Sequence, residues 1–139
     1  MTDAVVFLVA EDNGGHFALT KRCLRKAGFA NEILWFADGE QLLGFLSGNG
    51  PGDVRKAGAE YVLLLDIRMP KVDGIEILER LKRDCEFAEM PVIVVTTSDS
   101  PATIMRCRQL GCDGYVIKPL GENLIEAIMD VFSNCRHIA

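Results

Sequence analysis

The stretch Tyr61-Val62-Leu63-Leu64-Leu65-Asp66 decides the fold that we predict for this chain. A continuous apolar run of this length indicates a strand that is buried on both faces, as in a parallel sheet. A carboxylate at the end of such a strand is costly to desolvate unless something binds it. Ligands of open α/β sheets sit outside the carboxyl ends of the strands. Asp66 is therefore a candidate site residue.

Apolar runs alternate with amphipathic helical stretches along the rest of the chain. The predicted strands are Val5–Ala10, Glu32–Phe36, Tyr61–Leu65, Val92–Thr96 and Gly114–Ile117. The predicted helices are His16–Ala27, Gly39–Leu46, Ile75–Asp84, Ala102–Leu110 and Glu122–Cys135. Five strands alternating with five helices predict a doubly wound α/β domain. Right-handed crossovers would place helices on both faces of one five-stranded parallel sheet.

Capping and turn residues agree with this pattern. Asp38 and Ser100-Pro101 are typical helix starts, and Gly28 and Gly111 stand where helices should end. The segment from Ser47 to Glu60 is rich in glycine, which predicts a long surface loop.

The length of 139 residues indicates a single domain over residues 1–139 without an output domain, since only 21 residues follow Lys118. The net charge of −5 argues against a nucleic-acid binder. No apolar run approaches a membrane span, and no signal peptide is recognisable. The five cysteines (23, 85, 107, 112 and 135) lack CxxC spacing and indicate free cytosolic thiols, each a small buried or half-buried apolar side chain.

Polar residues stand at the carboxyl ends of four predicted strands: Glu11-Asp12, Asp66, Thr96 and Lys118. In a parallel sheet these ends share one edge. Three clustered carboxylates repel each other, and a divalent cation relieves the repulsion; all-oxygen ligands suit Mg²⁺. A lysine and a hydroxyl beside the metal can hold phosphoryl oxygens, with Asp66 as the nucleophile that forms an aspartyl phosphate. Taken alone, Glu11-Asp12 could be an ordinary loop pair and Lys118 a solvated surface charge.

With these residues the chain resembles the response-regulator receiver domains of two-component signalling, which implies their flavodoxin-like (βα)5 fold. The resemblance rests on Glu11-Asp12-Asn13, Asp66-Ile67-Arg68-Met69-Pro70 with Gly74, Thr96, Tyr115 and Lys118-Pro119. The spacings of 30 residues from Asp66 to Thr96 and 22 from Thr96 to Lys118 are typical of the family. The chain is similar, more narrowly, to single-domain regulators associated with bacterial phytochrome kinases. Asp38-Gly39-Glu40-Gln41-Leu42-Leu43, the glycine-rich loop and Thr96-Thr97-Ser98 carry that closer likeness.

The resemblance implies a role for each matching residue. Asp66 would accept a phosphoryl group from a histidine kinase or a phosphotransfer protein, in a domain that assists its own phosphorylation and dephosphorylation without being an enzyme for external substrates. Asp12 and Asp66 would bind Mg²⁺ directly, Glu11 through water and Arg68 through its main-chain carbonyl. Thr96 and Lys118 would bind phosphoryl oxygens. Thr96 and Tyr115 would form a switch pair, and the peptide bond before Pro119 would be cis.

Other function classes can be weighed on the same residues. A phosphatase of the haloacid-dehalogenase type also uses an aspartate and Mg²⁺, but needs a second Asp where this chain has Arg68. Arg68 itself could hold an oxygen at the site or be solvated. The complete set of site residues argues against a degenerate receiver that acts only as a scaffold. A flavodoxin-like cofactor protein would need a phosphate-binding loop after the first strand, and none is present.

Two surfaces are candidate partner sites. The last helix has two apolar stripes: Leu124, Ile128 and Val131, and Ile125, Met129 and Phe132. The second stripe is either part of a broad buried face or a contact surface, and the resemblance implies a homodimer through the fourth helix, fifth strand and fifth helix. The first helix carries Lys21, Arg22, Arg25 and Lys26, either as a solvated basic face or as a docking face for an acidic kinase surface.

Overall fold

The computed structural model describes residues 4–48, 55, 58–69 and 71–134. Its strands are β1 (Val5–Ala10), β2 (Ile33–Phe36), β3 (Glu60–Leu65), β4 (Val92–Thr96) and β5 (Gly114–Ile117). Its helices are α1 (Gly14–Lys26), α2 (Gly39–Ser47), α3 (Gly74–Arg83), α4 (Pro101–Gln109) and α5 (Glu122–Asn134). The predicted alternation of strands and helices is confirmed. The bounds of β1, β4 and β5 are as predicted, and those of the other elements differ by at most two residues.

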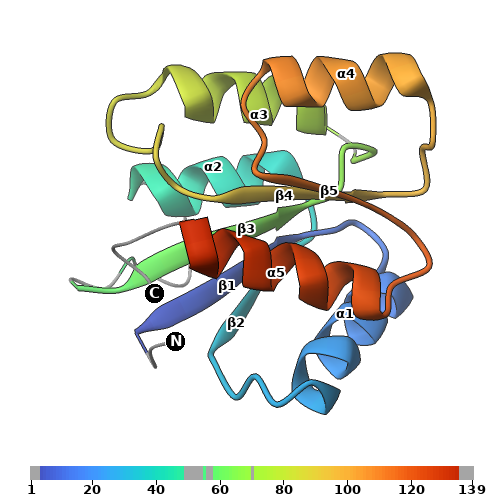
Figure 1. The fold of residues 1–139 in the computed structure, drawn as a ribbon. Helices are drawn as coiled ribbons and strands as arrows, with labels where there is room; N and C mark the ends of the chain where they lie inside the picture. The colour runs from blue at the N-terminus through green and yellow to red at the C-terminus, as the bar shows by residue number, and fades with distance from the viewer. Residues whose placement is uncertain (1–3, 49–54, 56–57, 70, 135–139) are drawn as a thin grey trace.

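The five strands form one parallel sheet in the order β2-β1-β3-β4-β5. Helices α1 and α5 cover one face of the sheet, and α2, α3 and α4 cover the other (Figure 1). The strand order reverses between β1 and β3, because the chain first moves outward to β2 and then returns past β1. Such a switch point is where ligands bind in open α/β sheets, and it lies at the ends of β1 and β3, beside Asp66.

Two apolar layers hold the helices on the sheet. Alternate residues of each strand point to opposite faces, so that Leu63 and Leu65 pack under α2 and α3, whereas Val62 and Leu64 pack under α1 and α5. All four side chains are essentially inaccessible to solvent. The prediction that Tyr61–Leu65 is buried on both faces is therefore confirmed for residues 62–65, and Tyr61 is half-buried at the strand's beginning.

Helix termini follow the predicted signals with one difference. Asp38 and Ser100 accept hydrogen bonds from the backbone N–H groups of Gln41 and Thr103, and Gly28 and Gly111 have φ values of 97° and 98° after their helices. Helix α1 begins at Gly14, two residues earlier than predicted. The reason is that the Asn13 side chain accepts the N–H of His16 and caps the helix before the glycine pair.

The predictions for the loop, the cysteines and the membrane have mixed outcomes. Most of the glycine-rich segment, residues 49–54 and 56–57, and Cys135 lie outside the described residues. Cys23, Cys85, Cys107 and Cys112 are free thiols; Cys107 is buried and Cys23 and Cys112 are half-buried, but Cys85 is exposed, contrary to the prediction. In the described part of the chain, no helix has the length and apolar character that crossing a membrane requires.

Candidate functional site

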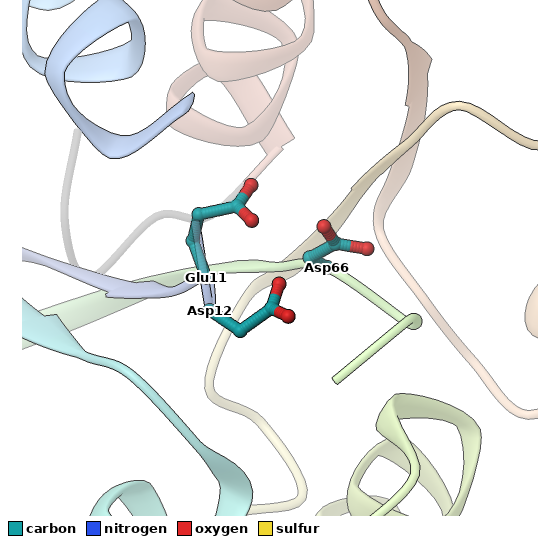
Figure 2. Close-up of side chains that lie close together, drawn as sticks. All are labelled: Glu11, Asp12 and Asp66. Atoms are coloured by element: carbon teal, nitrogen blue, oxygen red, sulfur yellow. The ribbon is translucent and has the colours of Figure 1, made fainter. Parts of the chain in front are cut away.

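Three carboxylates meet at the carboxyl ends of β1 and β3. Each of Glu11, Asp12 and Asp66 offers a ligand oxygen, and these oxygens lie within 4.8 Å of one another. Figure 2 shows the three side chains gathered at one place. Glu11 and Asp66 are buried and Asp12 is exposed, so the cluster opens to solvent on one side. The structure thus brings together the three residues that the sequence pattern singled out as metal ligands.

Lys118, at the end of β5, directs its ammonium into this cluster. Its Nζ lies 2.5 Å from Glu11 Oε1 and 3.2 Å from Asp66 Oδ2. Only 10% of its side chain is exposed, which excludes the alternative that Lys118 is a solvated surface charge. The contacts join β1, β3 and β5 across the edge of the sheet and make Glu11 part of a network rather than of an ordinary loop pair.

The charges at the site do not balance. Three carboxylates face one ammonium, which leaves an excess of negative charge at a site that is open to solvent only on the side of Asp12. Burial raises the pKa of Glu11, although the hydrogen bond from Lys118 acts in the opposite direction. This donor set, all carboxylate oxygens with surplus negative charge, fits a hard divalent cation such as Mg²⁺.

Two local features fix Asp66 after β3. Its Oδ1 accepts a hydrogen bond of 2.9 Å from the backbone N–H of Arg68, which orients the carboxylate. The first turn of α3 presses against the same backbone, because a Cβ added at Gly74 would stand 2.3 Å from Ile67 Cα and 2.7 Å from the Asp66 carbonyl oxygen. Only glycine allows this approach, which gives Gly74 in the motif a physical reason.

The predicted switch residues lie on neighbouring strands. Thr96 is fully buried, and its backbone carbonyl accepts the N–H of Lys118 at 2.7 Å. The Tyr115 hydroxyl donates to the carbonyl of Ser98, two residues beyond Thr96, at 2.9 Å. Burial raises the pKa of Tyr115, so this phenol is a donor at neutral pH. The Lys118–Pro119 peptide bond is cis, as the resemblance implies. Arg68 is exposed, which agrees with a solvated guanidinium.

A groove of about 630 Å³ lies beside the acidic cluster, between α1 and the segment that follows β5. Its lining includes Arg22 and Lys26 as well as Lys118. Arg25 has a structural role instead, because its guanidinium donates to the carbonyls of Phe29 and Asn31 at 2.8 and 2.7 Å and holds the turn after α1. The predicted basic face of the first helix therefore divides into groove residues and a structural arginine.

The two stripes of α5 differ in how far they are buried. Leu124, Ile128 and Val131 are buried as predicted for a sheet-facing stripe, and Phe132 of the second stripe is also buried. Met129 is 47% exposed. A groove between α4, β5 and α5 is lined instead by polar and charged residues, among them Arg108, Asp113, Glu126 and Asp130. The second stripe is thus partly a broad buried face and does not line this groove.

Sequence reasoning missed two residues that touch the site. His16, in the first turn of α1, places Nδ1 3.0 Å from Lys118 Nζ. Trp35, on the edge strand β2, donates its indole N–H to the Glu11 carbonyl at 2.7 Å and stacks on Phe17. The first turn of α1 follows directly on Asp12, which was a usable signal for His16. No sequence signal identified Trp35, because its partner lies 24 residues away.

Comparisons with known proteins agree with this geometry. Residues 7–130 match the model of the response regulator receiver domain. The probable methanogenesis regulatory protein FilR2 of Methanothrix harundinacea is 35% identical over 130 residues, which cover 93% of this chain and 82% of that protein.

Two solved structures extend the comparison. The bacteriophytochrome response regulator RtBRR superposes with a TM-score of 0.81 at 31% identity, covering 91% of this chain and 76% of RtBRR. The phosphorylated cyanobacterial phytochrome response regulator RcpA gives a TM-score of 0.72 at 26% identity over 92% of this chain and 89% of RcpA. By sequence, fold and the acidic edge of its sheet, this chain belongs to the response regulator receiver domains of two-component signalling.

Proposed function

We propose that this chain is a stand-alone signalling switch that receives a phosphoryl group on Asp66 from a histidine kinase or a phosphotransfer protein. The observation that carries the proposal is the position of the Asp66 carboxylate, within reach of the Lys118 ammonium at 3.2 Å and beside two further carboxylates. The site then combines a nucleophile, an ammonium that can bind oxygens of the transferred phosphoryl group, and a set of metal ligands. The phosphorylated state of the relative RcpA supports the same chemistry.

The transfer exchanges one bond to phosphorus for another. An Asp66 carboxylate oxygen forms a P–O bond while the P–N bond to the donor's histidine breaks, and the released imidazole takes a proton from solvent. Lys118 binds an oxygen of the transferred group, and the hydroxyl of Thr96 binds another. Because the chain offers Arg68 in place of a second aspartate, no general acid is provided for turnover of external phosphate esters.

Glu11, Asp12, Asp66 and the main-chain carbonyl of Arg68 would hold Mg²⁺. The bound cation would neutralise charge on the incoming phosphoryl group, which three carboxylates alone would repel. Trp35 is the only tryptophan of the chain and is hydrogen-bonded to the Glu11 carbonyl, so its fluorescence reports on this site. We expect Mg²⁺ to change that fluorescence with saturation in the native protein and without saturation in Asp12→Asn; identical titrations would contradict the proposed ligands.

The deciding experiment is incubation with acetyl phosphate and Mg²⁺, followed by intact mass measurement. We expect a single phosphoryl adduct on the native protein and none on Asp66→Asn, which keeps the size of the side chain. Native protein that gains no adduct would leave a scaffold role ahead, and steady hydrolysis of varied phosphomonoesters would favour a phosphatase.

The groove beside α1 supports docking of the phosphoryl donor. Arg22 and Lys26 line the same groove as Lys118, which contacts Asp66, so that an acidic donor surface bound along this groove would reach toward Asp66. Charge reversal of Arg22 and Lys26 should slow transfer from a histidine kinase and leave acetyl phosphate labelling unchanged, and Lys21→Glu, outside the groove lining, is the matched control. Equal transfer rates in all variants would reject this docking site.

The output would be made by contact with another protein or by passing the phosphoryl group onward. A homodimer would form through α4, β5 and α5. Met105 of α4 and Ile117 of β5 are exposed, at 61% and 37%, and the groove of about 410 Å³ between α4 and α5 carries both signs of charge. Sedimentation with and without beryllofluoride tests the homodimer, and a monomer in both conditions would remove this proposal.

The free thiols support a cytoplasmic location.

A further inference from the structure

The Lys118 ammonium has three acceptors, and one of them is not a carboxylate. Besides Glu11 Oε1 at 2.5 Å and Asp66 Oδ2 at 3.2 Å, the imidazole Nδ1 of His16 lies 3.0 Å from Nζ. An ammonium has three N–H donors and no lone pair. Glu11, Asp66 and His16 therefore occupy all of its donors, and the direction of Nζ is fixed from three sides.

The contact with Lys118 involves one nitrogen of the His16 ring. Because an ammonium can only donate, Nδ1 is the acceptor of this hydrogen bond, and the ring proton of that tautomer is on Nε2. A proton on Nδ1 would instead point at Lys118, and Glu11 Oε2 at 3.8 Å is too far away to accept it in a hydrogen bond. His16 thus contacts the lysine through a ring nitrogen, whereas the other two acceptors are carboxylates.

We infer that His16 is a positioning residue: it holds Lys118 at the place from which the ammonium meets the phosphoryl group, and so speeds phosphorylation of Asp66. This inference rests on the proposed function. Glu11 and Asp66 alone would draw the ammonium between their two carboxylates, where it also shields the nucleophile. The third contact comes from α1 and gives Nζ an acceptor outside the pair of carboxylates. The His16 side chain is 43% exposed and lines the groove beside α1.

Two substitutions separate the acceptor from the bulk of the ring. In His16→Asn the amide oxygen can take the place of Nδ1, because both atoms are bonded to Cγ. In His16→Leu the volume is kept and the acceptor is removed. Neither change touches the core, since the His16 side chain is 43% exposed and belongs to neither apolar layer, and the backbone carbonyl that accepts the Thr20 hydroxyl is present in both variants.

The test reads the lysine directly and then the reaction. A proton–nitrogen correlation spectrum of lysine ammonium groups should show a slowly exchanging Lys118 signal, assigned by its loss in Lys118→Gln, in the native protein and in His16→Asn. We expect His16→Leu to lose this signal and to be labelled by acetyl phosphate about fivefold more slowly, the effect of one net hydrogen bond. His16→Asn should keep the native rate.

The outcomes distinguish this inference from the proposed function. An unchanged Lys118 signal in His16→Leu overturns the inference, and so does a lost signal with an unchanged labelling rate. A His16→Asn variant that behaves like His16→Leu also overturns it, because the acceptor would then not be the cause. If the native protein takes up no phosphoryl group, the proposed function fails, while the spectra still decide whether His16 holds Lys118.

Discussion

Two lysines with mostly covered side chains lie at opposite ends of the sheet, and their hydrogen-bond partners differ in kind. At the carboxyl end, Lys118 is bound by the side chains of Glu11, Asp66 and His16. At the amino end, Lys82 of α3 donates to the backbone carbonyls of Ala88 and Met90 at 3.2 and 3.0 Å and pairs with Asp113 at 3.3 Å. Both side chains are mostly covered, with 10% and 15% exposed.

The difference separates a structural cation from a chemical one. Backbone carbonyls cannot change their charge, and Asp113 is further committed to the N–H of Val92 at 2.8 Å, so the surroundings of Lys82 are permanent. Those of Lys118 depend on carboxylates, and phosphorylation of Asp66 would replace one acceptor with phosphoryl oxygens. Lys82 and Lys118 are similarly buried and similarly bonded, yet their roles differ, because only the partners of Lys118 can change in the reaction.

The largest expected effect comes from removing the chemical lysine. Lys118→Met should slow labelling by acetyl phosphate by about a hundredfold or more, because a preorganised charge at the transferred oxygens is lost. Lys82→Met is the matched control, with the same change at the other end of the sheet and native labelling. The rates follow from intact mass measured over time, and equal slowing in both variants would break the distinction.

Stability should respond in the opposite way. Lys82→Met should lower the free energy of unfolding by about 2 kcal/mol, because Asp113 and two carbonyls lose a charged donor. Urea denaturation measures this loss. A fully stable Lys82→Met would contradict a structural role for this lysine.

Removing one carboxylate at the carboxyl end of the sheet should stabilise the protein. Asp66→Asn removes one of three crowded carboxylates and should raise the free energy of unfolding by about 1 kcal/mol in the absence of Mg²⁺. Added Mg²⁺ should reduce the difference, since the cation stabilises only the native cluster. Urea denaturation of both proteins, with and without the cation, checks this sign; a destabilised Asp66→Asn would show that attraction to Lys118 outweighs repulsion among the carboxylates.

The smallest expected effect is on the thiol beside Asp113. Burial raises the pKa of Cys112 to about 11, so little reactive thiolate is present at neutral pH and labelling by iodoacetamide should be slow. Lys82→Met should accelerate it severalfold by loosening the segment that Asp113 anchors, while Lys118→Met should not. Peptide mass mapping identifies the labelled cysteine, and exposed Cys85 gives the reference rate within the same sample.

The carboxyl end could be predicted from sequence far better than the amino end. Asp66 was recognisable because an ionised group ends an apolar strand, and parallel strands bring Glu11, Thr96 and Lys118 to the same edge whatever the helices do. Their roles in phosphoryl transfer remain a proposal. Lys82 gave no signal, since its partners belong to the turn after its own helix and to the start of a strand 31 residues away. Such contacts depend on the packing of side chains, which periodicity does not describe.

The same limit explains the differences at α1 and α5. Asn13 was noted as part of a motif, yet its capping bond moved the beginning of α1 to Gly14. Arg25 and Arg22 look equivalent as basic residues of one helix, and only the fold sends the first to two carbonyls and the second to the groove. Met129 and Phe132 share a stripe, but Met129 is exposed, whereas Phe132 is buried and packs edge-on against Phe29.

The close contact between Gly74 and the backbone at Asp66 and Ile67 also determines which substitutions position 74 can tolerate. A single methyl group at position 74 would collide with backbone atoms of residues 66 and 67, which have no side-chain freedom with which to yield. At Gly121, a Cβ would meet nothing within 4 Å. A random library should therefore tolerate most replacements at 121 and almost none at 74, which makes this glycine a fixed point of the sequence although it has no functional group of its own.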